Sequence, residues 1–406
     1  MTSRLFTAAP WHSSGRAVLL VAPEFPYPPR HGGTADVWER LRTLHRLGRT
    51  VDLLATVKAP PSADAVAAVR ELTRNCWWVP RTRRWGDHFH LDPFQAVSRR
   101  ALVRAELSES YEWTVLEGDC MAGVLGNPRL RTRQVAWRVN NDEPGYFWQL
   151  ARAAKGPASA YYALEAVKFA AWTARLRRQA GWQVWFAADG EQRQFAARGA
   201  AFAARSRWLP SPMPLDNVAA PHAGAGGALF VGSLFMPNNR AAVDWFLRRV
   251  HPKIHLPGYS LTVAGNVRGG EIEALRRRIA MTPNARLVAS PDEAQLRALY
   301  AQSRVFVNPM RQGGGIALKT PHALLAGLPV VTTTLGARGS GLQDQEHLEV
   351  ADAPAEFAAR VARVWANPSA AMAQVARAQA FIRHSFDHDR LLAEALTALP
   401  APMAGA

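Results

Sequence analysis

Short apolar runs alternate with helical patterns along most of the chain. The run 17–22 (AVLLVA) is continuous, as is typical of a central parallel strand that is covered on both faces. A turn-rich segment, 23–33, follows it and leads into a helical pattern that closes at Gly48. Further strands are predicted at 51–55, 113–116, 134–139 and 183–187. This alternation predicts a doubly wound α/β domain over residues 1–205.

The pattern breaks at 206–227, where prolines, glycines and alanines cluster, and we predict an interdomain linker there. A second α/β series over 228–385 has strands predicted at 228–231, 260–264, 285–288, 305–307 and 329–333. Helical patterns that start at Asn239, Glu271, Asp292, Lys319 and Pro354 separate or follow these strands. The chain ends in a helical tail, with 386–406 beyond the second domain, and such a tail can cross back to the first domain.

Length and composition agree with two domains. The 406 residues exceed the size at which one hydrophobic core usually stops growing, and 48% of them are apolar. Cys76 and Cys120 have no metal-ligand or disulfide-framework spacing, which fits a reducing compartment. Residues 1–16 have no signal-peptide core, and no apolar stretch approaches the ~20 residues that span a bilayer. We therefore expect a cytoplasmic protein.

The formal net charge of +17 has two interpretations. It is typical of proteins that bind nucleic acid, anionic lipid or phosphorylated substrates. However, only five of the 49 basic residues are lysines, and this arginine bias, together with abundant alanine, also fits GC-rich coding and a solvated surface. No nucleic-acid reader motif is recognisable, so we expect no nucleic-acid partner.

Each half of the chain has one glycine-rich turn between a strand and a helix. Arg30-His31-Gly32-Gly33 precedes the helix near Thr34, and Arg311 to Gly315 follows the strand 305–307 and precedes the helix near Thr320. Glycine lets a ligand approach the amides of a helix N-terminus, so both turns are candidate phosphate sites. Alone, each is equally typical of a tight turn.

Together with the surrounding sequence motifs, these turns resemble glycosyltransferase group 1 (family 4), which includes lipopolysaccharide and capsule enzymes. The matching segments, in order from residue 17 to about 385, are 28–33, 48–54, 138–143 with Tyr146, 230–233, 237–239, 308–309, 313–319, 326–333, Gly336 and Gly341. The resemblance implies the GT-B fold, in which two Rossmann-like domains face a central cleft. It also implies a glycosyltransferase that retains anomeric configuration, in cell-surface polysaccharide or glycoconjugate synthesis.

The resemblance assigns the nucleotide-sugar donor mainly to the second domain and a glycan or lipid-linked acceptor mainly to the first. Glu143, Asn141 and His31 are its candidate catalytic residues, although Glu143 also suits a helix N-terminus as a mere counter-charge. The donor sugar and diphosphate are assigned to Gly32, Gly33, Gly232, Asn238, Arg311, Gly313, Gly314, Gly315, Ile316, Ala317 and Lys319. Lys319 is expected to neutralise the diphosphate.

One departure from the family pattern concerns the donor. Many members carry two glutamates eight residues apart in the last motif, and the second of them holds the ribose hydroxyls. Aligned on Lys319 and Gly327, these positions are Gly314 and His322 in this chain. We expect His322 at the ribose, and the alternative is a surface position on the helix.

No metal or other cofactor is expected. The only D-x-D sequence, Asp387-His388-Asp389, lies in the helical tail and is predicted to be a solvated helix start. Without a cation, helix N-termini and basic side chains must stabilise the leaving diphosphate. Helix dipoles contribute ~0.3–1 kcal/mol each when exposed, so a lysine or arginine is expected nearby.

Aromatic residues alternate with cations at 77–104 and again at 168–185. Trp77, Trp78, Arg83, Arg84, Trp85 and the more distant Tyr146 are the candidate acceptor or membrane residues. Such interleaving suits a lipid-diphosphate acceptor or peripheral contact with an anionic membrane, and it also suits stacking on single-stranded nucleic acid. The alternative is aromatic rings in the core and arginines in water.

Two other functions are compatible with the same fold. One is a different GT-B enzyme, a nucleotide-sugar epimerase or a phosphorylase. The other is a catalytically inactive partner subunit, because both family glutamates are missing. An epimerase would release product without an acceptor, and an inactive subunit would turn over no donor.

Overall fold

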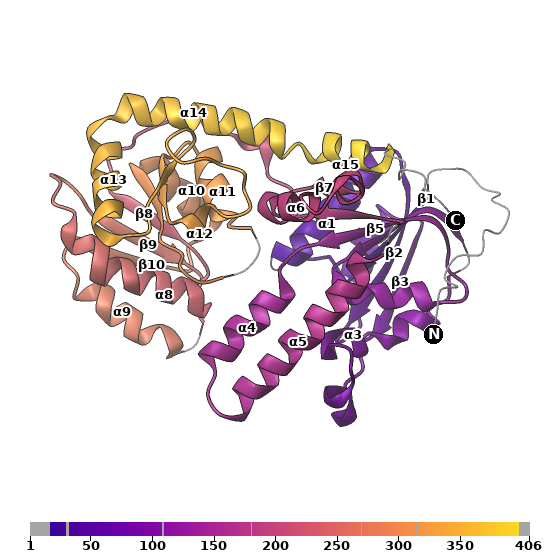
Figure 1. Ribbon diagram of the computed structural model, residues 1–406. Helices are drawn as coiled ribbons and strands as arrows, with labels where there is room; N and C mark the ends of the chain where they lie inside the picture. The colour runs from indigo at the N-terminus through magenta and orange to yellow at the C-terminus, as the bar shows by residue number, and fades with distance from the viewer. Residues whose placement is uncertain are drawn as a thin grey trace. The chain divides into compact units, whose positions relative to one another are not determined.

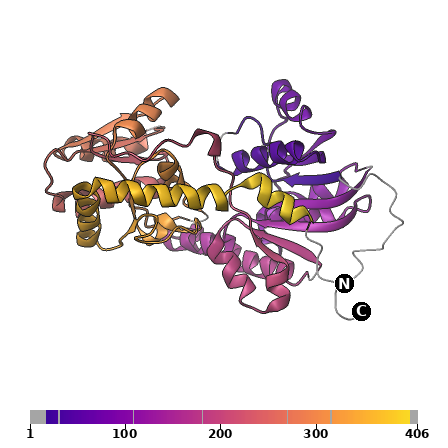
Figure 2. The same cartoon turned by 90° about the horizontal axis from the view of Figure 1, so that it is seen from above.

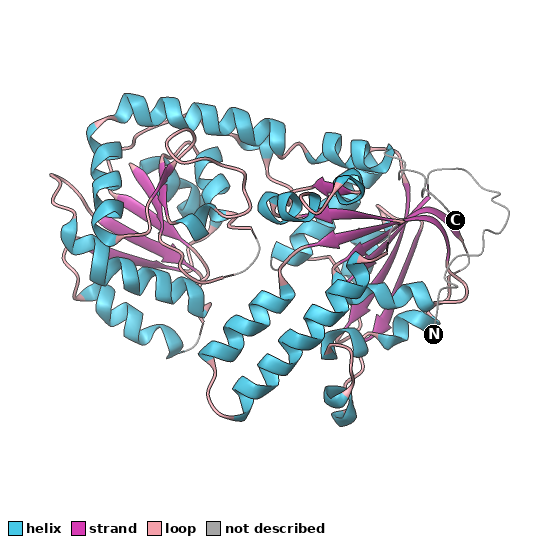
Figure 3. Ribbon diagram, in the orientation of Figure 1, coloured by secondary structure: helices cyan, strands magenta, loops and turns pink. Residues whose placement is uncertain are grey.

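The computed structural model describes residues 17–29, 32–107, 109–179, 181–268, 270–313 and 316–397. The chain divides into two compact units. Unit 1 runs as far as Pro212 and also includes the segment from His388, whereas unit 2 runs from Met213 to Asp387. Each unit contains a parallel sheet flanked by helices (Figures 1 and 3).

The described part of unit 1 has a seven-stranded sheet in the order β3-β2-β1-β4-β5-β6-β7, with all neighbours parallel. Its strands are β1 (Ala17–Ala22), β2 (Thr50–Val57), β3 (Asn75–Pro80), β4 (Ser110–Glu117), β5 (Arg131–Val139), β6 (Trp182–Phe186) and β7 (Ser206–Trp208). The strand order reverses between β1 and β4, and open α/β sheets bind ligands beyond the carboxyl ends of the strands at such a point.

Helices connect these strands and cover the sheet (Figure 3). They are α1 (Gly32–Arg46), α2 (Ala63–Arg70), α3 (Phe94–Val97), α4 (Glu143–Ala153), α5 (Pro157–Arg177), α6 (Asp189–Ala196), α7 (Ala200–Ala204), α15 (His388–Thr397) and the 3-10 helices η1 (Trp85–Phe89), η2 (Arg100–Arg104) and η3 (Asp119–Gly126). Helices α4 and α5 lie side by side as a helical hairpin (Figure 1).

The first apolar run forms β1 as predicted, and all six of its residues are buried. Val18, Leu20 and Ala22 pack on one face with α1 and α15, whereas Leu19 and Val21 pack on the other with η3 and α5. Because side chains alternate across a strand, a strand covered on both faces must be apolar throughout. Each fully buried leucine or valine contributes about 1.5–3 kcal/mol.

Helix α15, the last described element, is tied to α1 within unit 1. The Oδ1 atom of Asp389 accepts hydrogen bonds from Thr43 Oγ1 at 2.9 Å and from Arg46 Nη2 at 2.6 Å. Trp113 Nε1 donates to the carbonyl oxygen of Leu396 at 3.1 Å. Asp387 to Asp389 is therefore more than the solvated helix start that the sequence predicts, because Asp389 anchors the helix.

The described part of unit 2 has a six-stranded parallel sheet in the order β10-β9-β8-β11-β12-β13. The strands are β8 (Ala228–Val231), β9 (Leu261–Gly265), β10 (Ala285–Ala289), β11 (Val305–Asn308), β12 (Val330–Thr332) and β13 (Glu349–Val350). Its strand order reverses between β8 and β11. Both strands lie within one or two residues of their predicted limits.

The helices of unit 2 are α8 (Pro237–Trp245), α9 (Glu273–Ala280), α10 (Glu293–Gln302), α11 (Lys319–Leu325), α12 (Thr334–Ala337), α13 (Pro354–Ala366) and α14 (Pro368–Ser385). Short helices lie at Leu215–Asn217, Phe246–Val250, His251–Lys253 and Gly270–Ile272. The long helix α14 is prominent in Figure 2. Asp292 caps α10 through a hydrogen bond from the amide of Gln295 at 2.8 Å, which explains where this helix starts.

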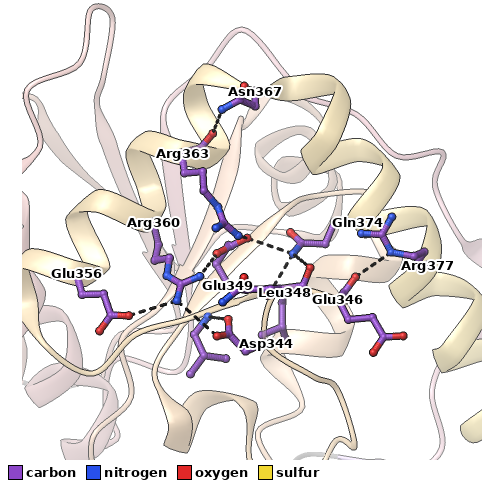
Figure 4. Close-up of polar contacts among 12 residues, drawn as sticks. Asp344, Glu346, Leu348, Glu349, Glu356, Arg360, Arg363, Asn367, Gln374 and Arg377 are labelled. Atoms are coloured by element: carbon purple, nitrogen blue, oxygen red, sulfur yellow. Dashed lines mark hydrogen bonds and ion pairs between the residues drawn. The ribbon is translucent and has the colours of Figure 1, made fainter.

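A buried carboxylate joins the short edge strand β13 to α13 and α14 (Figure 4). Glu349 is 2% exposed. It accepts hydrogen bonds from Arg360 Nη1 at 2.8 Å, from Gln374 Nε2 at 3.2 Å and from Arg363. A charge this deeply buried is tolerated only when it is paired and hydrogen-bonded, and Glu349 has both kinds of partner.

The predicted linker, 206–227, is more structured than its composition suggests. Residues 206–208 form β7. Further along, the amide of Ala219 donates to Leu325 O, and that of His222 donates to Gly327 O, both at 2.9 Å. Gly327 has φ +86°, and a Cβ atom there would lie 2.3 Å from Ala220 O, so glycine is required for this close approach. Proline and glycine here mark irregular backbone that is nevertheless docked on unit 2.

Candidate active site

A cavity of about 240 Å³ lies in unit 2, at the carboxyl end of β11. Five of the predicted donor residues line it: Asn238, Gly313, Ile316, Ala317 and Lys319. They come from the start of α8, the loop after β11 and the first residue of α11. The cavity therefore lies where the strand order of the second sheet reverses, as the position of nucleotide sites in open α/β sheets predicts.

Lys319 supplies the positive charge of this cavity. Its ammonium donates to Asn239 Oδ1 at 2.5 Å and lies 5.4 Å from the ring centroid of Phe230. Among the described residues, no carboxylate forms an ion pair with it. Burial lowers the pKa of Lys319 from 10.5 to about 8, so the ammonium remains mostly charged at neutral pH. A partly buried cation that has only neutral partners is suited to a phosphate.

Gly232 lies directly behind Lys319. A Cβ atom at Gly232 would lie 3.1 Å from Lys319 Cε and 3.2 Å from Asn239 Nδ2. Any side chain at this position would therefore press on the lysine and on the asparagine that orients it. Glycine at position 232 therefore leaves the space that Lys319 occupies.

The remaining predicted donor residues lie elsewhere in unit 2, in unit 1 or outside the described residues. Arg311 does not line the cavity, and its guanidinium lies over the Trp245 ring at 4.9 Å. His322 is on the exposed side of α11 and does not line the cavity either. Gly314 and Gly315 fall outside the described residues.

Sequence reasoning missed Asn308 and Asn239 as site residues. Asn308 is fully buried at the end of β11, where Nδ2 donates to Thr320 Oγ1 at 3.0 Å and to Gly336 O at 3.1 Å. Its Oδ1 atom has no hydrogen-bond partner in the described structure. The available signal was position, since a polar residue directly after a predicted buried strand lies at the ligand-binding edge of the sheet.

Unit 1 has a small cavity of about 120 Å³ where β1, β4 and β5 end. Glu143 and Asn141, two of the three predicted catalytic residues, line it together with Asp119 and Arg99. The third predicted catalytic residue, His31, lies outside the described residues. Gly32, also assigned to the diphosphate, is the first residue of α1, and Gly33 lines a larger cavity of the same unit.

Glu143 is the first residue of α4, which Asp142 caps through a hydrogen bond from the amide of Gly145 at 3.2 Å. Burial is the main reason why the pKa of Glu143 is raised from 4.5 to about 7, and the nearby carboxylate of Asp119 raises it further. A side-chain hydrogen bond with Asn141 and the charge of Arg99 act in the opposite direction and lower it. A carboxyl group whose pKa lies near neutral pH can both accept and release a proton.

Buried ion pairs lie next to the small cavity, which Glu117 lines. Arg40 of α1 forms ion pairs with Glu117, at the end of β4, and with Asp36, at 2.8 Å in the latter case. Arg138, at the end of β5, pairs with Asp36 at 3.0 Å. Burial would raise the pKa of Asp36, but the two guanidinium groups lower it to about 2. Arg138, the first residue of the matching segment 138–143, therefore has a structural role.

The larger cavity of unit 1 has a volume of about 930 Å³. Lys58 and Arg81 line it, and they directly follow β2 and β3. Arg99 lines both cavities of the unit, as do Pro23 and Gln95. Of the predicted acceptor residues, Arg83 lines this cavity.

The other predicted acceptor residues divide between packing and exposure. Trp77 packs against the hydrophobic core, so the structure gives it a packing role. Trp78 is 37% exposed and contacts Phe25, and Tyr146 is 40% exposed beside Phe147. Trp85 and Arg84 are exposed, Trp85 to 81%. Sequence could not assign Trp77 and Trp78 to opposite faces without knowing that they lie on a strand.

Among the described residues, no group of three or more His, Cys, Asp or Glu side chains is placed to hold a metal ion. No described helix combines the length and apolarity required to cross a bilayer.

Comparison with known proteins gives a family match for the second unit. Residues 226–367 match the model of the glycosyl transferases group 1. Over 389 residues the chain is 28% identical to an uncharacterized 44.6 kDa protein in the cps region of Klebsiella pneumoniae, with 92% of this chain and 97% of that protein covered.

Several solved structures share the fold. WaaG, a glycosyltransferase involved in lipopolysaccharide biosynthesis, has a TM-score of 0.60 at 14% identity, with coverage of 96% of this chain and 100% of that chain. HepE of Anabaena, in complex with UDP and glucose, has a TM-score of 0.61 at 12% identity and coverage of 95% and 100%. TarM has a TM-score of 0.67 at 8% identity and coverage of 96% and 99%. The second unit therefore matches the group 1 glycosyl transferases, and the two parallel sheets flanked by helices share the GT-B fold of these solved structures.

Proposed function

We propose that this protein transfers a sugar from a nucleotide-sugar donor, bound by unit 2, to a glycan or lipid-linked acceptor bound by unit 1. The observation that carries the proposal is the cavity of unit 2, where Lys319 brings to the end of β11 a cation that has no ion-pair partner in the described part of the chain. That arrangement suits the diphosphate of a nucleotide sugar. Uridine nucleotides are the first donors to test, because HepE was solved with UDP and glucose.

In the proposed reaction, the bond between the anomeric carbon and the diphosphate oxygen breaks, and the nucleoside diphosphate leaves with the electron pair. The hydroxyl oxygen of the acceptor bonds to the anomeric carbon, and its proton passes to the carboxylate of Glu143. Lys319 and the backbone amides around Gly313 stabilise the charge that develops on the leaving group. The pKa of Glu143, raised by burial to about 7, suits a base at neutral pH.

Retention at the anomeric carbon and transfer without a metal ion are finer parts of the proposal. The match of unit 2 to the group 1 glycosyl transferases supports retention. Lys319 supports a metal-independent reaction, because it places a protein cation where the diphosphate charge develops. Product stereochemistry can be read from the anomeric proton coupling by NMR. An inverted product, or activity that is lost with a chelator and restored by a divalent cation, would contradict these assignments.

The physiological product is proposed to be a cell-surface polysaccharide. The relative encoded in the cps region and the structural similarity to WaaG support this class. The His322 assignment to the donor ribose, like the assignments of Arg311, Gly32 and Gly33 to the donor, stays a prediction.

A donor screen tests the proposed function directly. The purified chain is incubated with UDP-, GDP- and ADP-sugars, and thermal shift and release of nucleoside diphosphate are measured with and without acceptor extracts. A ligand at about 100 times its Kd adds ~2.7 kcal/mol of stability, which is readily detected. Binding of a nucleotide sugar together with acceptor-dependent release supports the proposal. Product formed without acceptor would identify an epimerase, and binding without turnover under any condition would identify an inactive subunit.

We also propose peripheral contact with the inner face of the membrane through the residues around η1. Trp85, Phe89 and Leu91 are 81%, 70% and 89% exposed. The turn that carries them is held by the ion pair between Asp87 and Arg100 at 2.6 Å. Exposed apolar side chains beside arginines suit the interface of an anionic bilayer.

Vesicle sedimentation tests this contact. Binding to vesicles that contain phosphatidylglycerol should fall with added salt and should be lost in Trp85→Ser with Phe89→Ser, whereas Met281→Ser, at an 83% exposed site in unit 2, should leave it unchanged. Equal binding of neutral vesicles, or no binding at low salt, would end this part of the proposal.

A further inference from the structure

The large cavity of unit 1 has a cationic wall and an aromatic wall. Lys58 and Arg81 lie at the carboxyl ends of neighbouring parallel strands, so both reach the same edge of the sheet. Tyr161 and Tyr162 of α5 line the cavity as well, together with Phe94 of α3. Cations and rings thus meet in a single space of about 930 Å³, which is large enough for one or two sugar rings.

The carboxylates that line this cavity are already engaged. Glu24 forms an ion pair with Arg81 at 3.0 Å. Glu165 pairs with Lys168 at 2.9 Å and accepts a hydrogen bond from the amide of Phe94 at 2.9 Å. Lys58, Arg83 and Arg99 have no carboxylate partner among the described residues, so the cavity carries uncompensated positive charge.

Arg99 is the most informative of the three cations. It is 5% exposed, and its position is fixed by hydrogen bonds from Nε to Thr56 Oγ1 at 3.2 Å and from Nη1 to Gln95 O at 2.7 Å. Burial lowers its pKa to about 10, so it is charged at neutral pH. A buried guanidinium that has no ion-pair partner costs free energy, and binding of an anion would recover part of that cost.

Arg99 also lies between the large cavity and the candidate base, Glu143, because it lines both cavities of unit 1. Arg99, Pro23 and Gln95 line both the large cavity and the small cavity that contains Glu143. A molecule in the large cavity can therefore have its anionic group beside Arg99 and a hydroxyl group in the direction of Glu143.

We propose that the large cavity is the acceptor site and that the acceptor is an anionic glycoside, whose carboxylate or phosphate binds Arg99, Arg83 and Lys58 while a sugar ring packs on Tyr161 and Tyr162. This inference rests on the proposed function and adds to it the chemical class of the acceptor. A uronic acid residue and a sugar phosphate would supply the same charge, and the experiment must separate them.

Binding without any donor provides the test. Three probes, methyl β-D-glucuronide, glucose 6-phosphate and neutral methyl β-D-glucoside, are titrated against the full chain by ligand-observed NMR. We expect one or both anionic probes to bind at least tenfold more tightly than the neutral glucoside. The stronger of the two identifies the carboxylate or the phosphate as the acceptor group. Equal binding of charged and neutral probes, or no binding of any probe, would overturn the inference.

Variants locate the site. Arg99→Gln should reduce binding of the preferred anionic probe at least tenfold, and circular dichroism shows whether this buried change preserves the fold. Lys58→Gln combined with Arg83→Gln changes two exposed side chains and should have the same direction of effect with the fold intact. Lys155→Gln removes an exposed lysine that does not line the cavity and is the matched control. Unchanged affinity in the double variant would refute the assignment.

The outcome is separable from that of the proposed function. Lys319→Met removes the proposed diphosphate contact in unit 2 and should leave binding of the anionic probe unchanged. If the probes bind as expected but no nucleotide sugar is ever bound or consumed, the acceptor-site chemistry stands and the proposed transfer reaction fails.

Discussion

At the residue scale, burial decides which ionisable groups are suited to chemistry. Glu143 and Lys319 are both first residues of helices, and burial moves the pKa of each toward neutral pH, to about 7 and about 8. A helix N-terminus by itself would stabilise the glutamate's charge and slightly disfavour the lysine's. In both cases desolvation is the larger effect, so neither residue behaves as a simple helix-end charge.

Glu143→Gln should remove a pH dependence from both stability and activity. The folded protein retains the Glu143 proton between pH 4.5 and about 7, whereas the unfolded chain releases it, so the wild-type free energy of unfolding falls as pH rises through this window. The variant should show a smaller fall. In transfer assays the wild-type rate should rise toward a plateau above about pH 7, and the variant should lack this rise.

Glu106→Gln is the matched control, because its side chain is 86% exposed. Chemical denaturation at pH 5 and pH 8 checks the stability difference, and initial rates across the same range check the activity. A glutamine variant whose pH profiles coincide with those of the wild type would show that Glu143 is not the titrating group.

At the element scale, buried polar anchors hold helices onto sheets whose edge strands are short. The two-residue strand β13 can contribute few ladder hydrogen bonds, and Glu349 supplies the missing connection to α13 and α14 (Figure 4). In unit 1, the half-exposed Asp389 and the buried His388 hold α15 against helix α1, where His388 Nε2 lies 3.1 Å from Arg40 Nη1. These anchoring residues are distant in sequence from the residues that they contact.

Glu349→Ala should destabilise unit 2 by about 1.5–3 kcal/mol, the usual range for a lost hydrogen bond to a charged group. The Arg360 side chain is only 16% exposed, so in this variant its charge would also lose a buried ion-pair partner. Urea denaturation checks the change. Glu356→Ala removes a 51% exposed partner of the same arginine and should cost at most about 0.5 kcal/mol. Equal effects of the two substitutions would contradict the anchoring role.

At the scale of the whole molecule, the chain leaves unit 1 near Pro212 and returns to it at His388. In the predicted linker, Pro214, Asp216 and Asn217 are exposed around the half-buried Leu215, a residue type that thermolysin cleaves. A single cut would leave α15 attached to the C-terminal fragment although it packs with α1 of the N-terminal fragment.

We therefore expect thermolysin to nick the chain near Leu215 and the two fragments to co-elute in native size-exclusion chromatography. They should separate in urea. The control is the same digestion with Arg46→Ala combined with Asp389→Ala, which should weaken the association. Cleavage only near the ends of the chain, or fragments that separate without denaturant, would show that this boundary or the role of α15 is wrong.

Most of the fold could be predicted from sequence because strands buried on both faces leave a continuous apolar signal. The prediction of 17–22 coincides with β1, and the strands at 228–231 and 305–307 also agree with β8 and β11. Strands β3, β7 and β13 were not predicted, because they lie at or near sheet edges and are short or contain polar residues.

The candidate site was less predictable. Glycine-rich motifs and Lys319 could be found because their local spacing is unusual, and five of the nine described donor residues line one cavity. Arg99 and Lys58 could not be singled out, because their roles depend on which strand ends are neighbours in the sheet and on how deeply each side chain is buried.

The most direct test of the central claim, that the unit 2 cavity binds the donor diphosphate through Lys319, is the affinity of Lys319→Met for nucleoside diphosphates. Losing a charge-assisted hydrogen bond costs about 1.5–3 kcal/mol, so binding should weaken by roughly 10- to 150-fold and transfer should fall with it. The melting temperature of the free variant should stay unchanged or rise slightly, because burial already disfavours the charge of Lys319. Lys253→Met, at the other lysine of unit 2 and on an exposed site, should bind as the wild type does. A Lys319→Met variant with wild-type affinity for the diphosphate and normal transfer would contradict the account.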